Sequence, residues 1–139
     1  MLAYLMMKTS RNLKCKLDRA LKDDGITSSQ FSVMNYMESV GNETAAHEIA
    51  EALGYDRPTV SAMINRLYKN KFIEKNQKPT DKRMQYLSLT TEGLSTLYAL
   101  RKTADDLSDE IFGHLTQIEK ETLIKTLNLI NDKLEATNG

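Results

Sequence analysis

The hydrophobic residues of this chain recur mostly with helical spacing, and the pattern is clearest in the stretch YDRPTVSAMINRLYKN, Tyr55–Asn70. Its apolar residues fall at i, i+3, i+4 and i+7, so they share one face of a helix and belong in a core. They are Val60, Met63, Ile64 and Leu67. We expect Asp56 to cap this helix. Pro58 is tolerated in the first turn, where the amides have no helical partners.

The opposite face of this predicted helix is polar and basic. It carries Arg57, Thr59, Ser61, Asn65, Arg66 and Lys69. These side chains donate hydrogen bonds or carry positive charge, which suits contact with the phosphates and base edges of nucleic acid. A plainly solvated helix face is the alternative, and charge alone does not separate the two interpretations.

Similar stripes and capping signals predict further helices on both sides. Residues 2–22 carry a loose apolar stripe that ends at the sequence DDGI. Thr27 and Gln30 form a capping box for a helix that continues through Met37. Thr44 is expected to cap a short helix that stops at Gly54.

After residue 90 the helical pattern returns. Thr90 is expected to cap a long helix that Gly113 ends, and a capping box of Thr116 and Glu119 opens the last helix. Both the first and the last predicted helices carry apolar stripes that the small lobe between them cannot cover. A second copy of the chain is the economical cover.

The period changes to two between these helices. FIEKNQ (72–77) and MQYLSLT (84–90) alternate in part between apolar and polar residues, which is typical of short strands. The sequence KPTDKR (78–83) between them holds no apolar residue, one proline and three cations. It predicts a basic β-hairpin loop.

The order of these elements defines a fold class. A short helix, a tight turn, a second helix with a polar face and a basic hairpin form the layout of a winged helix-turn-helix. The chain is therefore expected to be mostly α (α+β). In this layout the second helix enters the major groove of DNA, so the polar face becomes a recognition face.

Composition sets limits on this interpretation. The 139 residues are 40% hydrophobic, enough for a single domain over 1–139, and the net charge is zero. Residues 56–90 nevertheless carry eight basic and three acidic side chains, which favours a localised phosphate-binding surface over a general polyanion coat. The N-terminus lacks a signal-peptide pattern, no long apolar run predicts a membrane span, and a single cysteine cannot form an internal disulfide. We expect a cytoplasmic protein.

The sequence also resembles the MarR-type transcription regulators. The resemblance rests on four motifs in the family's order, and it covers nearly the whole chain. They are ITSSQFSVM (26–34), TAAHEIAEALGYDRPTVSAMINRL (44–67), DKRMQYLSLTTEG (81–93) and LTQIEKETL (115–123). The third, which holds the wing residues Asp81, Lys82 and Arg83, is the most specific.

The resemblance implies a homodimer that binds double-stranded DNA. Residues 1–24 and 91–139 would form the dimerisation helices, and 27–90 the DNA-binding winged lobe. Each lobe would place its recognition helix in the major groove and its wing in the adjacent minor groove of a pseudo-palindrome. The expected function is a sequence-specific regulator, a repressor rather than an activator, released from its operator by a small-molecule effector.

The expected roles of the site residues differ. Base reading is assigned to Arg57, Thr59, Ser61 and Asn65, and phosphate contact to Arg66, Lys69, Lys78 and Lys82. Arg83, supported by Asp81, is expected to enter the minor groove. A winged helix used only for protein interaction is the alternative to DNA readout.

Cys15 offers a different alternative, a redox-sensing regulator. It lies between Lys14 and Lys16, and neighbouring cations favour the reactive thiolate. In peroxide-sensing members of the resembled family, however, the cysteine lies nearer the start of its helix, and their helper tyrosine is replaced here by Ser28 or Ser29. A packed or idle thiol is the preferred interpretation.

Other site chemistry finds little support in the sequence. His47 and His114 have no partner at metal-ligand spacing, and His47 is expected in a helix first turn, so we expect no metal and no cofactor. No phosphate-binding glycine loop or nucleophile elbow is present, which argues against an enzyme. The methionines fit either a core or an adaptable ligand pocket, and core is preferred. They are Met6, Met7, Met34, Met37 and Met63.

Overall fold

The computed structural model describes residues 1–41, 43–78 and 80–138, without the side chains of Asp81, Lys82 and Asn138. The chain is mostly helical with one small antiparallel sheet, as the sequence predicts. Its elements are α1 (Leu2–Leu21), the 3-10 turn η1 (Lys22–Asp24), α2 (Ser28–Ser39), α3 (Ala46–Leu53), α4 (Arg57–Lys69), β1 (Ile73–Lys78), β2 (Asp81–Leu89), α5 (Thr91–Phe112) and α6 (Gln117–Asn138).

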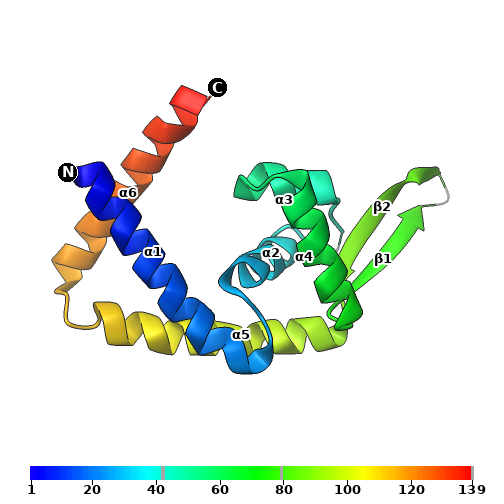
Figure 1. The fold of residues 1–139 in the computed structure, drawn as a ribbon, viewed down its shortest axis with the longest axis horizontal. Coiled ribbons are helices and arrows are strands. Elements are labelled where there is room, and N and C mark those ends of the chain that lie inside the picture. Colours follow the sequence, from blue (N-terminus) through cyan, green and yellow to red (C-terminus); the bar gives the residue numbers. More distant parts are fainter. Residues whose placement is uncertain (42, 79, 139) are drawn as a thin grey trace. The chain divides into compact units, whose positions relative to one another are not determined.

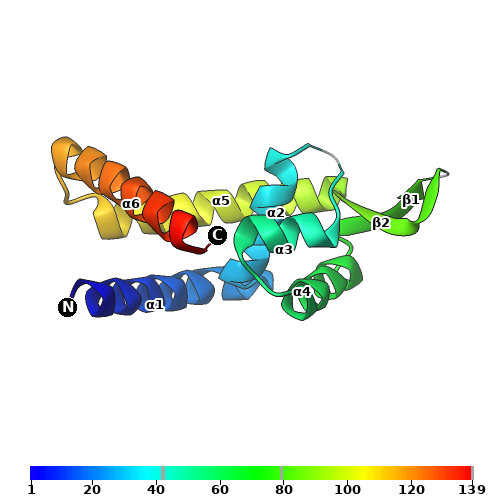
Figure 2. The ribbon, with the colours of Figure 1, turned by 90° about the horizontal axis from the view of Figure 1, so that it is seen from above.

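The chain divides into two compact units, Met1–Ala104 and Asp105–Gly139, and α5 contributes to both. Within the first unit, α3 packs on α2 and on α4, and β1 follows α4 and packs against it. Figures 1 and 2 show the β1–β2 hairpin projecting beside α4, away from α2. The expected winged helix-turn-helix is therefore present, with α3 and α4 as its two helices.

Most of the helix starts form as their capping signals predict. The side chains and amides of Thr27 and Gln30 exchange hydrogen bonds of 3.1 Å in a complete capping box. Asp56 caps α4, and the hydroxyl of Thr90 accepts from the amide of Gly93 at 2.9 Å. Thr116 and Glu119 form the second capping box. These bonds satisfy amides that lack helical partners.

The predicted cap at Thr44 is wrong. The N-cap residue of α3 is Ala45, which has no side chain to cap with. Thr44 instead forms an isolated β-bridge with Leu87, with backbone hydrogen bonds of 3.0 and 2.7 Å in the two directions. Its hydroxyl donates to the Glu48 carboxylate at 3.3 Å. The Thr44 side chain therefore contacts the first turn of α3 through the Glu48 carboxylate and does not cap the helix.

The hairpin is confirmed, but its loop is shorter than predicted. The strands pair from Ile73 opposite Leu89 to Lys78 opposite Asp81, with a bulge between Gln77 and Lys78. Asp81, Lys82 and Arg83 therefore belong to β2 and not to a loop over 78–83. Pro79, which helped to predict that loop, lies outside the described residues.

The hydrophobic core lies in the first unit. It includes the four residues of the α4 stripe, between 0 and 8% exposed, together with Val33, Ile49, Leu87 and Leu97 from four other elements. Each such side chain contributes about 1.5–3 kcal/mol by leaving water. The α4 stripe thus turns the polar face of the helix outward.

α1 and α6 keep much of their apolar surface exposed. On α1 the exposed residues include Leu2, Tyr4, Leu5 and Met7, and on α6 they include Ile118, Ile124, Leu129 and Leu134. No helix in the described part of the chain is long and apolar enough to cross a membrane.

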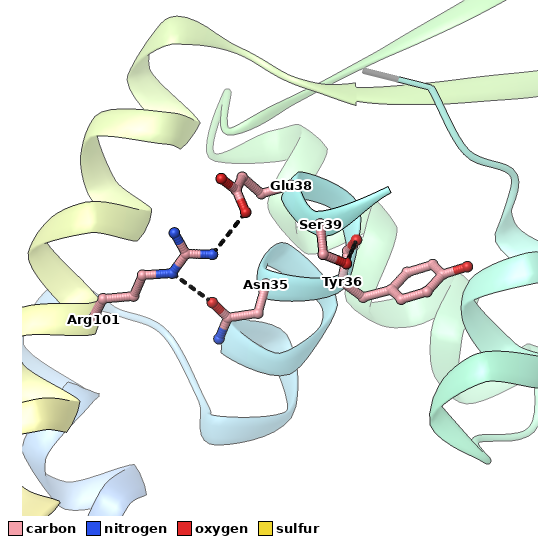
Figure 3. Close-up of polar contacts among 5 residues, drawn as sticks. All are labelled: Asn35, Tyr36, Glu38, Ser39 and Arg101. Carbon is pink, nitrogen blue, oxygen red and sulfur yellow. Dashed lines mark hydrogen bonds and ion pairs between the residues drawn. The ribbon is translucent and has the colours of Figure 1, made fainter. Parts of the chain in front are cut away.

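A charged contact joins α5 to α2 within the first unit (Figure 3). Arg101 donates from Nε to Asn35 Oδ1 at 2.8 Å and from a terminal nitrogen to Glu38 Oε2 at 2.9 Å. The Arg101–Glu38 ion pair is about one-third exposed on both sides. Because a guanidinium has a rigid fork of donors, two acceptors one turn apart on α2 define its position closely.

The close approach of Gly93 to the chain before the hairpin yields a stability prediction. A Cβ at this position would lie 2.1 Å from the Phe72 carbonyl oxygen, which already accepts from the Thr90 amide at 3.0 Å. We expect Gly93→Ala to lower the free energy of unfolding by about 1–3 kcal/mol, despite the better helix propensity of alanine. Urea denaturation measures this, with Ser95→Ala, an exposed position on the same helix, as control. An unchanged midpoint for Gly93→Ala would contradict the steric argument.

Candidate nucleic-acid interface

The outward face of α4 carries the residues that the sequence assigns to DNA contact. Arg57, Thr59, Ser61, Asn65, Arg66 and Lys69 are all exposed. Apart from Pro58, Ala62 and Tyr68, no other residue of α4 is exposed. Because the apolar stripe is buried behind them, these six side chains reach solvent from one rigid helix.

Asp56 organises the start of this face. Its Oδ1 accepts from the Thr59 amide at 2.8 Å. This hydrogen bond lowers the pKa of Asp56 below the ordinary carboxyl value, so the side chain stays charged at neutral pH. A carboxylate at the positive end of the helix dipole is favourable. Asp56, the acidic residue at the start of this face, therefore serves as the cap of α4.

Asn65 is tied to the hairpin. Lys75 of β1 donates from Nζ to Asn65 Oδ1 at 2.9 Å. The same ammonium lies 4.5 Å from the centroid of the Tyr68 ring, within the range of a cation–π contact. The polar face of α4 and the hairpin are thus connected through side chains, and not only through the chain between them.

Lys78 is already paired on the surface. Its Nζ lies 3.1 Å from Glu43 Oε2 and 4.3 Å from the centroid of the Tyr86 ring. The hydrogen bond to Glu43 raises the pKa of Lys78 above its ordinary value. Both side chains of the ion pair are 47% exposed, and such pairs are weak in water. A phosphate can therefore compete with Glu43 for this lysine.

The other predicted contacts fall in two places. Arg83 is exposed on β2, while the side chains of Asp81 and Lys82 lie outside the described part of the chain. Arg66, in the last turns of α4, lines a groove with Lys14 of α1 and with Thr27 and Gln30 at the start of α2. Arg83 thus lies on the hairpin, whereas Arg66 shares a groove with a second cation, Lys14.

Sequence reasoning missed Lys75, Tyr68, Glu43 and Tyr86 as individual residues. Lys75 entered the sequence analysis only as one of the eight basic residues of 56–90. A signal was available, because Lys75 lies two positions after buried Ile73 in a strand and so shares its face. β1 packs on α4, and Lys75 contacts Asn65 there.

The structure also shows where the residues considered for a ligand pocket, a metal site or redox sensing lie. Met34, Met37 and Met63 lie in the core, as preferred, whereas Met6 and Met7 are exposed on α1. His47 lies in the first turn of α3, and the Cys15 thiol is exposed rather than packed. Among the described residues, no group of three histidine, cysteine or acidic side chains lies where it could hold a metal ion.

Comparisons with known proteins show what this chain is similar to. The family model described as MarR family matches residues 26–84. The regulator BilQ of Clostridioides difficile is 23% identical over 94% of this chain and 88% of its own length. The regulator PrsX of Escherichia coli is 24% identical over 98% of this chain and 80% of its own length.

Two similar structures were solved with DNA. The complex of a mutant MarR from E. coli with operator DNA has a TM-score of 0.83 at 25% identity, covering 93% of this chain and 92% of the other. The MepR–DNA complex of S. aureus has a TM-score of 0.84 at 26% identity, covering 96% and 98%. Fold and site together define a winged helix-turn-helix protein. The family model matches the winged lobe, and with these relatives the protein is a DNA-binding transcription regulator similar to the MarR family.

Proposed function

We propose that this protein binds an operator in double-stranded DNA as a homodimer and acts as a repressor. The observation that carries the proposal is the outward face of α4. Its apolar stripe is buried, and its exposed side chains are those that read base edges and bind phosphates. The similar MarR and MepR structures with DNA support the same role.

The contacts divide by chemistry. α4 enters the major groove, where Arg57, Thr59, Ser61 and Asn65 meet base edges. Arg66, Lys69, Lys78 and Lys82 bind phosphates, and Arg83 of the wing enters the minor groove with support from Asp81. Phosphate contacts position the protein without reading sequence, whereas base contacts specify it.

The homodimer is supported by the exposed apolar residues of α1 and α6. Large contiguous apolar surfaces are rare on monomers and mark interfaces. In the second unit, Phe112, Leu115, Leu123 and Leu127 line an open apolar groove between the end of α5 and α6. Residues 1–24 and 91–139 form the dimerisation region, and the two lobes of 27–90 read the halves of a pseudo-palindrome.

The effector site we propose is a groove between α1 and α2. Leu13, Lys14 and Leu17 line one side, and three serines of α2 line the other. Ser28 Oγ, in a residue that is only 7% exposed, makes no hydrogen bond of good geometry in the described part of the chain, although Asp18 Oδ1 accepts from the Ser28 amide at 2.6 Å. A buried hydroxyl of this kind needs a partner. Apolar walls, hydroxyls and one cation suit a small organic acid.

The DNA proposal is tested by selecting bound sequences from a random pool and then comparing two variants. Asn65→Ala should weaken operator binding by about 1–3 kcal/mol and random DNA little, because it removes a base contact. Arg83→Ala should weaken both more evenly and reduce the slope of log affinity against log salt by about one. Failure to select any sequence would favour a protein-interaction module.

The dimer is tested by light scattering on a variant of α6. We expect Leu127→Glu to raise the dimer dissociation constant at least about tenfold, because it buries a charge in an apolar interface. Thr126→Glu, the exposed neighbour, adds the same charge outside the apolar groove and should leave the mass unchanged. Equal masses for the wild type and Leu127→Glu, both monomeric or both dimeric, would contradict the proposed interface.

The effector site is tested with a panel of small aromatic and aliphatic carboxylic acids. A ligand should raise the melting temperature of the wild type by several degrees and weaken operator binding. Lys14→Ala should abolish both effects, while Lys16→Ala, which removes the cation on the other side of Cys15, should retain them. Equal responses in the two variants would place the effector elsewhere. Release by peroxide that Cys15→Ser abolished would favour the redox alternative.

A further inference from the structure

The contact between Lys75 and Asn65 limits what Asn65 can offer to a base. A free asparagine amide presents an acceptor and two donors, and that combination matches adenine, with its N7 acceptor and N6 donor. In this protein the acceptor is engaged, because Lys75 donates to Asn65 Oδ1 at 2.9 Å. An ammonium has donors only, so it must face the amide oxygen and not the nitrogen.

The lysine is held in this position from a second side. Its ammonium lies 4.5 Å from the centroid of the Tyr68 ring, three residues beyond Asn65 on the same helix. Residues three apart on a helix are neighbours on its surface, so the Asn65 amide and the Tyr68 ring can contact the same ammonium. Lys75 is partly buried there, whereas Asn65 and Tyr68 are exposed. The Lys75 ammonium therefore fixes the orientation of the Asn65 amide in the absence of DNA.

The outward chemistry of the pair follows from this orientation. Asn65 Nδ2 makes no hydrogen bond within the described part of the chain, so both of its N–H groups remain available. The second lone pair of Oδ1 lies beside a positive charge, where the N6 amino donor of adenine is repelled. Together the amide nitrogen and the ammonium form a surface of donors alone.

We propose that Lys75 is a specificity-determining residue, and that the Lys75–Asn65 pair selects guanine over adenine at one position of each operator half-site. Guanine presents two acceptors, O6 and N7, on its major-groove edge, which complement a surface of donors. This inference rests on the proposed DNA-binding function, and within it on Asn65 as a base-reading residue. Lys75 acts by orienting Asn65 and by excluding the adenine donor.

The experiment is selection from a random DNA pool with the wild type and three variants. Asn65→Ala identifies the position, because base preference should be lost there and nowhere else. Lys75→Met keeps most of the apolar stem against Tyr68 but removes the charge. It should raise the adenine-to-guanine ratio at that position about tenfold, since a freed amide can pair with adenine.

Lys78→Met is the matched control. It removes a second hairpin lysine that also lies over a tyrosine ring, but one that contacts Glu43 and not Asn65. It should weaken binding to all sequences without changing the preferred base at any position. Circular dichroism and melting temperature check that each variant is folded.

Several outcomes would overturn the inference, and they differ from a failure of the DNA-binding function. A wild type that binds no DNA sequence refutes the function itself. A wild type that binds but prefers adenine at the Asn65 position refutes the donor-only surface. If Lys75→Met behaves like Lys78→Met, then Lys75 leaves Asn65 for a phosphate on binding, and the specificity role is wrong. If Asn65→Ala keeps the base preference of the wild type at every position, then Asn65 contacts no base, and the pair cannot select one.

Discussion

Burial of one face of α4 is the constraint on which the interface depends. Val60, Ile64 and Leu67 are between 0 and 4% exposed, so turning the helix about its axis would return their side chains to water. Each would lose about 1.5–3 kcal/mol on exposure. The polar side chains of α4 therefore have no freedom to turn inward. The polar face of α4 is rigid because the core beneath it is closely packed.

The hairpin is placed by the same core and by a backbone bridge. Ile73 and Leu87 are each 2% exposed, and Leu87 also exchanges two backbone hydrogen bonds with Thr44 before α3. Lys75 adds a side-chain contact from β1 to α4. Wing and recognition helix are thus positioned by burial, by backbone pairing and by one charged hydrogen bond. Arg101 likewise connects α5 to α2 through two side-chain hydrogen bonds.

Local signals were reliable where nothing distant competed with them. The capping box of Thr27 and Gln30 and the cap at Asp56 formed as predicted, because each bond lies within one turn of its own helix. Thr44 has the same side-chain chemistry as Thr27, yet its backbone is engaged by Leu87 from another element. The loop over 78–83 was misjudged for a similar reason, since strand pairing continues to Asp81.

The sequence by itself determined the helical stripes, the hairpin and the set of exposed cations, because these depend on periodicity and composition. Only the tertiary structure decided which cations have partners. Lys75 and Lys78 both belong to the predicted hairpin, yet one contacts Asn65 and the other contacts Glu43. Hydrogen-bond pairing needs atoms within about 3 Å, and such distances between separate elements arise only from packing. The charge of the wing was therefore readable in advance, but the partners of its lysines were not.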